Sequence, residues 1–445
     1  MKKITIRIAE SLCQQIIKDL SRKHSYAFER SGFLIGKSKE YYDNNLLIVI
    51  TEYLQIPDEY YIEDDSVGAR INSEAIRKAM QVAMDRKCSV FHVHKHFGEG
   101  TPRFSSTDLD ELPEVIKAFE NANMKSVHGA ILLSDDGANV LFRPNSSIGR
   151  IHLEKIVRVG YPMSFNEQSY NKIRYDEDRY SRQSFLGEFS QQVLSIIKVG
   201  IIGLGGGGSH IVQQLAHLGI LNYVLFDGDI LEDSNLNRLI GANVGDARLK
   251  VRKSEVVYRQ IIGLQPKAIV EIVNKKWQEQ PESLQQCDVI FGAVDSFVVR
   301  RDIELESRRY LIPYIDIGMD VRILSPNPPR LFGQVILSVP GRPCMHCTNF
   351  LTDDLLARET EKYGDAGTKP QVVWSNGVLA SNAVGIFVDL VTNWSSSSQV
   401  AFFQEYDGNN NSLTRSYKLD YLEEETCPHY PLDEAGPIDW GETKT

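Results

Sequence analysis

Val199-Gly-Ile-Ile-Gly-Leu-Gly-Gly-Gly-Gly-Ser-His210 is the stretch of this chain that decides the fold. An apolar run stops at glycines and gives way to the helical pattern of residues 211–218, which predicts a buried strand, a tight turn and a helix. Gly203, Gly205 and Gly208 satisfy the spacing G-x-G-x-x-G. Glycine permits a sharp turn and lets a phosphate approach the backbone, while the N–H groups at the start of the helix attract it. The stretch therefore predicts a nucleotide-binding turn.

The residues that follow narrow the kind of nucleotide chemistry. Tyr223-Val-Leu-Phe226 predicts a second strand, and Asp227 lies 19 residues beyond Gly208, about where an acid that binds a ribose belongs. An enzyme that splits ATP between the α- and β-phosphates needs cations to neutralise developing charge and a carboxylate to hold Mg²⁺, whereas a nicotinamide enzyme needs no such set. Such residues occur in order at Asp229, Asn235, Arg238, Lys250, Lys253, Asp295 and Arg300.

Residues 179–320 resemble the ThiF/MoeB adenylyltransferases, which are relatives of the ubiquitin-activating enzymes. The resemblance implies a Rossmann-like α/β domain with a mostly parallel central sheet. It also implies MgATP and the C-terminal carboxylate of a peptide or small protein as substrates, with an acyl-adenylate and pyrophosphate as products. The matching words are Arg179-Tyr-Ser-Arg-Gln183, Gly203-Leu-Gly-Gly-Gly-Gly-Ser209, Asp227-Gly-Asp229, Ser234-Asn-Leu-Asn-Arg238, Lys253-Ser-Glu255, Asp295-Ser296 and Ile312-Pro-Tyr-Ile-Asp-Ile-Gly318.

The charges of these residues divide the expected roles. Asp227 is expected to hold the ribose hydroxyls, while Asp229 and Asp295 are candidates for binding Mg²⁺ and orienting the phosphates. The substrate carboxylate is already ionised at neutral pH, so catalysis needs placement and charge neutralisation rather than a general base. The expected nucleotide-binding residues are Gly203, Gly205, Gly206, Gly208, Asp227, Asp229, Asn235 and Asp295, with Arg238 and Lys253 as catalytic cations that contact the phosphates.

Two further cations need separate treatment. Lys253 is preferred to Lys250 because Lys253-Ser-Glu255 fits the family better, and the choice between the two lysines stays open. In the family that the chain resembles, the arginine at the position of Arg182 reaches the triphosphate bound by a partner subunit. The resemblance therefore implies a homodimer in which Arg182 acts in trans; the bland alternative is a surface arginine ahead of a helix.

Composition bounds the class of protein. A length of 445 residues predicts two or three domains, and 42% apolar and 24% charged residues are ordinary for a globular protein. The net charge of −10 argues against nucleic acid as the main partner. We expect no membrane span and no signal peptide, because no apolar run is long enough for the first and the start lacks the pattern of the second. Six cysteines make no disulfide framework, which favours a cytoplasmic setting.

A cluster of histidines marks the N-terminal part of the chain. Three of the ten histidines lie within five residues, in Cys88-Ser-Val-Phe-His-Val-His-Lys-His-Phe97. Alternate residues of a strand share a face, so His92 and His94 point the same way and His96 is next in line. Asp108 is expected in the first turn of a helix that begins near Ser105 or Ser106. Two histidines and an aspartate leave Zn²⁺ an open position for water, whose pKa the metal lowers to about 7.

These residues resemble the JAMM/MPN metallopeptidases, which cut ubiquitin-like proteins from whatever follows their C-terminus. By this resemblance His92, His94 and Asp108 bind zinc, Glu29 is the general acid/base and Ser105 steadies the oxyanion. The spacing departs from the family, since ten residues separate His94 from Ser105 and Lys95 replaces a usual proline. The register His94/His96 would leave eight. We prefer His92/His94 because Val90 and Phe91 flank it as strand core, and the other register stays open; a solvated strand edge or a degenerate metal site are the bland alternatives.

The patterns also predict individual elements and the division into domains. We expect a JAMM/MPN-like α+β domain at 1–160, a polar linker at 161–178 and a ThiF-like adenylyltransferase domain at 179–445. Residues 348–372, with Gly364-Asp-Ala-Gly367, have the composition of a crossing loop. The expected strands are 3–8, 27–36 and 46–50, with Glu29 on the second, and the expected helices are 10–20, 73–84, capped by Ser73 or Asn72, and 373–391.

A pair of cysteine words in the C-terminal third suggests a second metal. Cys344-Met-His-Cys347 is a C-x-x-C knuckle, and Cys427-Pro-His429 lies 80 residues on. In the adenylyltransferase family such pairs form a structural zinc site with four cysteines, but Tyr430 stands where the fourth would be. The site uses His429 in its place or is lost. Alternatively, Cys344 or Cys347 accepts an acyl group as a thioester.

Together the two resemblances predict a bifunctional enzyme. One part would adenylate the C-terminal carboxylate of a small ubiquitin-like β-grasp protein with MgATP, and the other would use zinc to cleave after that C-terminus. Such a pair resembles bacterial ubiquitin-like conjugation or sulfur-carrier systems, in which a conjugating enzyme is a further candidate partner. The alternatives are adenylation of a short peptide or small acid beside a vestigial peptidase domain, and a non-catalytic scaffold that binds ubiquitin-like proteins.

Overall fold

The structure is a computed structural model. It describes residues 2–64, 67–144, 146, 149–166, 169–170, 173–323, 326–361, 370–396, 402–422 and 426–437. The chain divides into two compact units. Unit 1 comprises Met1–Lys172, Arg309–Leu311 and Pro431–Thr445, and unit 2 comprises Ile173–Arg308 and Ile312–Tyr430. The first division falls inside the segment 161–178, while the two later returns to unit 1 have no local pattern that indicates them.

Unit 1 is built on a mixed eight-stranded sheet in the order β10-β9-β1-β3-β2-β6-β7-β8. β1 runs parallel to β3 and β9, and β6 runs parallel to β7, while β2 is antiparallel to both of its neighbours. The strands are β1 (Lys2–Ala9), β2 (Ser31–Glu40), β3 (Asn45–Gln55), β6 (Ser89–Lys95), β7 (Gly129–Leu133), β8 (Ala138–Leu141), β9 (Ile151–Val159) and β10 (Ser164–Phe165), with a separate pair β4 (Tyr61–Ile62) and β5 (Arg70–Ile71).

The helices of unit 1 are α1 (Glu10–Leu20), α2 (Ser73–Asp85) and α3 (Ser106–Ala122), with a short 3-10 turn at Asp58–Tyr60. The side chain of Asn72 caps α2, and Ser105 caps α3 in a capping box with Asp108, so both predicted helix starts are confirmed. The strand expected at 27–36 starts only at Ser31. Placing Glu29 on a strand was therefore wrong: Glu29 lies in the preceding loop, where its N–H donates to the carbonyl of Gly68.

Unit 2 contains a second eight-stranded sheet, in the order β13-β12-β11-β14-β15-β16-β17-β18. β13, β12, β11, β14 and β15 are parallel, and β15 to β18 form an antiparallel meander. The expected "mostly parallel" sheet is thus a mixed sheet, parallel in one half only. The strands are β11 (Lys198–Ile202), β12 (Asn222–Phe226), β13 (Ile269–Val273), β14 (Val289–Gly292), β15 (Tyr314–Arg322), β16 (Arg330–Ser338), β17 (Phe402–Asp407) and β18 (Ser412–Arg415).

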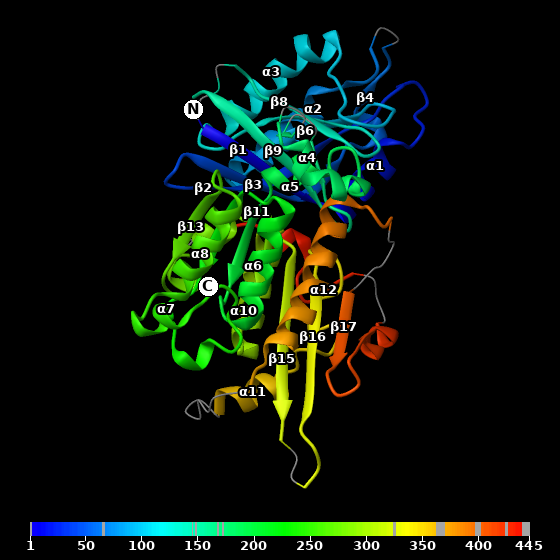
Figure 1. The fold of residues 1–445 in the computed structure, drawn as a ribbon. Helices are drawn as coiled ribbons and strands as arrows, with labels where there is room; N and C mark the ends of the chain where they lie inside the picture. The colour runs from blue at the N-terminus through cyan, green and yellow to red at the C-terminus, as the bar shows by residue number, and fades with distance from the viewer. Residues whose placement is uncertain are drawn as a thin grey trace. The chain divides into compact units, whose positions relative to one another are not determined.

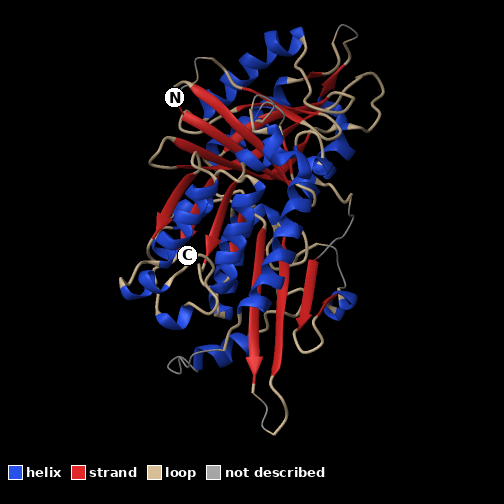
Figure 2. Ribbon diagram, viewed as in Figure 1, coloured by secondary structure: helices blue, strands red, loops and turns tan. Residues whose placement is uncertain are grey.

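Helices pack on the parallel and antiparallel halves of this sheet (Figures 1 and 2). α6 packs against β11 and α8, and α12 packs against α6, β15 and β16. The helices are α4 (Glu177–Tyr180), α5 (Ser190–Ile196), α6 (Gly206–Leu218), α7 (Val244–Arg248), α8 (Lys253–Leu264), α9 (Pro281–Gln285), α10 (Phe297–Arg309), α11 (Asp353–Glu361) and α12 (Val373–Thr392), with 3-10 turns at Ser181–Leu186, Asp233–Asn235, Trp277–Glu279 and Tyr417–Tyr421 and, in unit 1, at Leu432–Glu434.

The strand order positions a site in unit 2. The chain leaves β11 toward β12 on one side and later returns to β14 on the other side of β11. In open α/β sheets, ligands bind outside the carboxyl ends of the strands at such a reversal of strand order. The glycine-rich turn follows the carboxyl end of β11, so the topology places that turn at the reversal.

α12 confirms the predicted long apolar helix. By length and composition it could cross a membrane, but 67% of its most apolar window is buried, and the core helix of a soluble protein passes the same test. The stretch 348–372 is not all loop, because α11 forms within it. Gly364-Asp-Ala-Gly367 lies outside the described residues.

Candidate functional site

A cavity of about 250 Å³ lies at the carboxyl ends of β11, β12 and β14. It brings together the side chains and backbone that the sequence assigned to nucleotide binding, from five separate segments of the chain. Of the predicted set, Gly203, Gly205, Gly206, Asp227, Asp229, Asn235, Arg238, Lys253 and Asp295 line this cavity.

Gly208 has a different place from the other glycines. It is not among the residues that line the cavity; a Cβ there would lie 1.9 Å from the carbonyl oxygen of Gly203. Gly203 itself has φ +87°, a conformation that side chains rarely adopt. Gly208 therefore lets α6 approach the turn, and Gly203 lets the turn form, so that the first residues of α6 face the cavity.

Asp227 fixes the end of β12 against the glycine turn. One carboxylate oxygen accepts from the N–H of Leu204 at 2.7 Å, and the other accepts from the N–H of Asp229 at 2.8 Å. Burial raises the pKa of Asp227, and nearby Lys253 and the two N–H groups partly offset that effect. The carboxylate thus joins two of the loops that form the cavity, in addition to the ribose contact expected of it.

The structure distinguishes the two candidate lysines. The Nζ atom of Lys253 lies 2.7 Å from Oδ2 of Asp229, and its backbone N–H also donates to the carbonyl of Asp229. Arg238 donates through Nη1 to the carbonyl of Ser234 at 2.6 Å, which anchors the guanidinium at the cavity. Lys250 does not line the cavity.

Sequence reasoning missed two polar residues of this cavity. Gln371 donates through Nε2 to Oδ1 of Asp295 at 3.3 Å, and Asn376 lies on the first turns of α12 close to Gly206. Their position at the start of an apolar helix was the available signal, but no local pattern links that helix to the glycine turn. Arg182 is exposed in the 3-10 turn at Ser181–Leu186 and does not line the cavity of its own chain.

The predicted residues of unit 1 also meet in one place. A cavity of about 610 Å³ is lined by Glu29, His92, His94, His96, Ser105 and Asp108, among others. Nε2 of His94 lies 3.3 Å from Oδ1 of Asp108, and Nε2 of His96 lies 3.7 Å from Oδ2 of the same carboxylate. Oε1 of Glu29 lies 3.9 Å from Nε2 of His96. Ligand atoms of Glu29, His94 and His96 lie within 4.8 Å of one another.

His92 sits deeper on the same strand. Its ring lies 5.5 Å from that of His94 and 6.1 Å from Phe33, and its Nδ1 is buried with no hydrogen-bond partner. Burial lowers the pKa of His92 to about 3, and the neighbouring His94 lowers it further than Asp108 raises it, so the imidazole is neutral at pH 7.

Ser105 and Asp108 are tied to each other. The Ser105 hydroxyl donates to Oδ2 of Asp108 at 2.7 Å and accepts from the backbone N–H of Asp108. Burial works against the ionised form of Asp108, but the hydrogen bonds from His94 and Ser105 prevail and lower its pKa. The Ser105 hydroxyl therefore orients an ionised aspartate here, and the oxyanion contact that the resemblance implied stays a prediction.

The donor set of this cavity fits a metal ion. Nδ1 of His92 and Nδ1 of His94 are buried without a hydrogen-bond partner, while Nε2 of His94 lies 3.3 Å from Oδ1 of Asp108. Buried polar atoms are nearly always paired, so these nitrogens indicate a ligand that the protein chain does not supply. Neutral imidazole and carboxylate are the ligands that catalytic zinc prefers.

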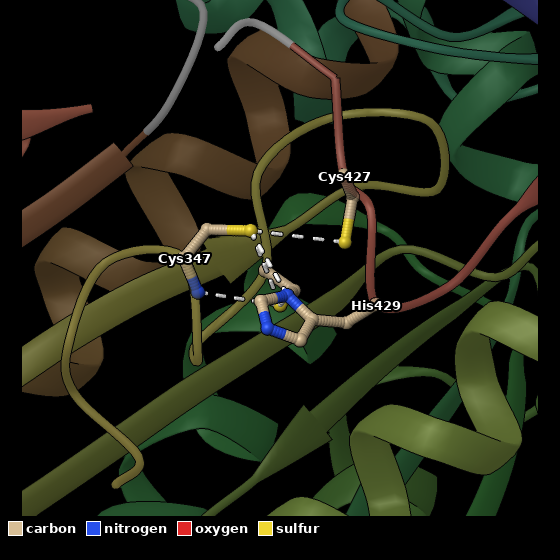
Figure 3. A group of neighbouring side chains, drawn as sticks. Cys347, Cys427 and His429 are labelled. Carbon is tan, nitrogen blue, oxygen red and sulfur yellow. Dashed lines mark hydrogen bonds between the residues drawn. The ribbon is translucent and has the colours of Figure 1, made fainter. Parts of the chain in front are cut away.

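A second donor cluster lies in unit 2. Cys344, Cys347, Cys427 and His429 point toward one another, the last three labelled in Figure 3. The Sγ atom of Cys347 lies 3.6 Å from that of Cys344 and 3.8 Å from that of Cys427. Nδ1 of His429 lies 3.5 Å from Sγ of Cys344 and 3.4 Å from Sγ of Cys347. A tetrahedral zinc ion with bonds of about 2.3 Å to sulfur separates its ligands by about 3.7 Å, so a Cys₃His site fits.

The buried Arg308 favours the thiolate of Cys427, whereas the hydrogen bond with Cys427 raises the pKa of Cys344 and burial raises the pKa of Cys347. The hydrogen bond from Cys344 lowers the pKa of Cys427 to about 4, and Arg308 lowers it too, against the effect of burial. Arg308 is fixed by Glu304, 3.6 Å from its Nε, and by the carbonyl oxygens of Arg342 and Pro343, to which it donates.

Replacing Cys347 with serine is expected to remove one zinc ion per chain and to lower the thermal stability of unit 2. The physical reason is that structural zinc supplies folding free energy, about 10 kcal/mol or more in small zinc domains. Metal analysis and differential scanning calorimetry of the purified protein measure both effects. His346→Ala is the matched control, because His346 stacks on His429 at 5.4 Å but is outside the ligand cluster. Retention of zinc by the Cys347 variant would contradict the assignment.

Comparison with known protein families matches residues 178–429 to the ThiF family. The matched residues include the whole nucleotide cavity and the cysteine–histidine cluster, and they exclude the histidine cavity of unit 1.

Three curated relatives share part of this chain. Molybdopterin-synthase adenylyltransferase of Haemophilus influenzae is 30% identical over 37% of this chain and 74% of its own length. Adenylyltransferase and sulfurtransferase uba4 of Aspergillus terreus is 33% identical over 45% of this chain and 42% of its own length. SAMP-activating enzyme E1 of Haloferax volcanii is 29% identical over 38% of this chain and 61% of its own length. The chain thus spans less than two thirds of the last two relatives.

Proposed function

The chain belongs to the ThiF family, and from that premise we propose that it uses MgATP to adenylate the C-terminal carboxylate of a small ubiquitin-like or sulfur-carrier protein. The observation that carries the proposal is the meeting of Arg238, Lys253 and Asp295 around the glycine turn in one cavity. The names of three relatives support adenylation as the reaction class. They are a molybdopterin-synthase adenylyltransferase, an adenylyltransferase and sulfurtransferase, and a SAMP-activating enzyme.

The arrangement supports an in-line displacement at the α-phosphate. An oxygen of the substrate carboxylate bonds to the α-phosphorus, the bond from that phosphorus to the bridging oxygen breaks, and pyrophosphate leaves with the electron pair. Bound Mg²⁺ supplies charge neutralisation on the phosphates, and Asp229 and Asp295 are the residues that would hold it. Lys253 and Arg238 stabilise the negative charge that builds on the leaving group, and the turn before α6 offers backbone N–H groups.

We include a second copy of the chain in this proposal. Arg182 is exposed and lies outside the cavity of its own chain, so a contact with the triphosphate would come from the Arg182 of a partner subunit. In other enzymes of phosphoryl transfer, an arginine supplied by a second protein molecule stabilises the negative charge of the transition state.

For unit 1 we propose a zinc-dependent peptidase that cleaves after the C-terminus of a ubiquitin-like protein. The geometry favours His94, His96 and Asp108 as zinc ligands, because both imidazoles contact the same carboxylate. Glu29 lies close enough to His96 to serve as the general base for a metal-bound water. A zinc ion bound there would lower the pKa of that water. In this assignment His92 is a buried neutral side chain that does not bind the metal.

The proposal for unit 2 is tested by exchange of labelled pyrophosphate into ATP. The full chain is incubated with MgATP, labelled pyrophosphate and one of three candidate substrates: a small β-grasp protein ending in Gly-Gly, the same protein with an amidated C-terminus, or a free short peptide. Exchange only with the free carboxylate of the protein is the expected result. Exchange with the short peptide alone favours the small-acid alternative, and no exchange with any of them favours the scaffold.

A further inference from the structure

A second cavity of unit 2 opens beside the nucleotide cavity. It measures about 380 Å³, within the range of sites that hold small ligands or single side-chain anchors. One wall is the face of β15, β16 and β17 that carries Gly318, Gln334 and Glu405, and the opposite wall comes from α10 and α11. Figure 1 shows the three strands as neighbouring arrows.

The walls of this cavity, here called the anchor cavity, are largely apolar. Six apolar side chains contribute to them, four of them phenylalanines: Phe297, Met319, Phe332, Phe350, Leu355 and Phe403. Only Phe403 is fully buried, while Phe332 and Phe350 keep part of their surface exposed. Partly exposed aromatic rings that line one hollow are a feature of surfaces that take up an apolar group.

The anchor cavity adjoins the nucleotide cavity. Asp295, Gly318 and Met319 line both of them. The side chains of Arg300 and Gln334 lie against Gly318 there, since a Cβ on residue 318 would lie 2.3 Å from Nη2 of Arg300 and 2.4 Å from Nε2 of Gln334. A chain whose terminal carboxylate reaches the α-phosphate therefore has the anchor cavity beside its preceding residues.

Charge does not select the occupant of the anchor cavity. Its lining carries three acids, Asp295, Asp320 and Glu405, and three bases, Arg300, Arg322 and Lys418. One of these charges is already paired within the protein, because Nε of Arg300 lies 3.0 Å from Oδ1 of the buried Asp316. Selection between partners then depends on the apolar walls, since matched charges favour neither an acidic nor a basic segment.

We propose that the anchor cavity binds a large apolar side chain, aromatic or branched aliphatic, that lies a few residues before the C-terminal carboxylate of the protein to be adenylated. This inference rests on the proposed adenylation reaction and adds a requirement to it. The requirement is a bulky apolar residue that precedes the last residues of the partner tail. Phe332 and Phe350 determine specificity by contact with that side chain, and the buried Phe403 packs against Phe350.

The test uses a pool of synthetic decapeptides with free C-terminal carboxylates and the last five positions randomised. The full chain is incubated with the pool, with and without a non-hydrolysable ATP analogue, and the retained peptides are sequenced by mass spectrometry. We expect phenylalanine, tyrosine, leucine or methionine to be enriched about tenfold or more at one position, because an apolar pocket discriminates at that level. The Phe332→Ala variant is expected to lose most of that enrichment.

Leu331→Ala is the matched control, since Leu331 directly precedes Phe332 in β16, is outside the anchor cavity and faces the other side of the sheet. It should keep the enrichment, and calorimetry shows whether both variants are folded. Retention without a positional apolar preference, no retention, or the same preference in Phe332→Ala would each overturn the inference. Binding of the ATP analogue and pyrophosphate exchange are measured separately: if they succeed while the pool shows no preference, only the anchor cavity is refuted, and if both fail, the adenylation proposal fails.

Discussion

Replacing Lys253 with alanine is expected to slow ATP-dependent adenylation by about 100-fold to 1,000-fold, the usual cost of removing one preorganised charge donor at a transition state. Lys253 is suited to this role because its side chain is only 13% exposed and its ammonium lies 2.7 Å from Asp229 in the nucleotide cavity. Charge on the departing pyrophosphate develops during the reaction, so kcat should fall more than KM rises. Steady-state kinetics of adenylation with a β-grasp protein as substrate measure both constants.

Lys250 provides the control for this experiment. It is only three residues from Lys253, carries the same charge and lies outside the nucleotide cavity. Lys250→Ala should change kcat by less than about twofold, because exposed charges far from the reacting atoms contribute little. If Lys250→Ala abolishes activity while Lys253→Ala remains active, the assignment of the two lysines is reversed. Thermal unfolding of both variants separates loss of catalysis from loss of folding.

Replacing His96 with alanine is expected to remove the zinc from unit 1 and with it any cleavage after a ubiquitin-like C-terminus. Catalytic zinc needs three protein ligands. Losing one of them should weaken zinc binding by more than the roughly 10-fold to 100-fold loss of affinity that follows when a residue hydrogen-bonded to a ligand is removed. Metal analysis of the purified protein gives the direct measurement. The ion in the cysteine–histidine cluster of unit 2 should remain, so the expected content falls from two ions per chain to one.

His92→Ala decides between the two histidine registers. The ring of His92 is deeper in the sheet, and the contacts to Asp108 at 3.3 and 3.7 Å come from His94 and His96. We therefore expect His92→Ala to keep the zinc, with some loss of stability because a buried ring has been deleted. Loss of zinc in His92→Ala together with its retention in His96→Ala would instead support His92 and His94 as the ligand pair. Absence of zinc from unit 1 in the wild-type protein would remove the peptidase proposal.

Local sequence was sufficient to predict those structural features that depend on residues adjacent in the chain. The strand, turn and helix around Gly203 were predictable because a buried strand, a glycine turn and an amphipathic helix each have their own short pattern. The caps at Asn72 and Ser105 were predictable for the same reason, since a capping side chain bonds to N–H groups two or three residues away. The position of Glu29 was not predictable, because the boundary of β2 depends on pairing with β3 and β6.

The sequence by itself determined the glycine turn, the order of acids and cations after it, and the membership of both histidines and cysteines in candidate metal sites. Only the tertiary structure decided which of those residues meet: that His96 joins His94 at Asp108, that His429 completes the three cysteines, and that Gln371 and Asn376 reach the nucleotide cavity. The physical reason is that a strand or helix pattern fixes the direction of a side chain relative to its own element alone. Which elements become neighbours is set by sheet order and core packing, and these depend on the whole chain.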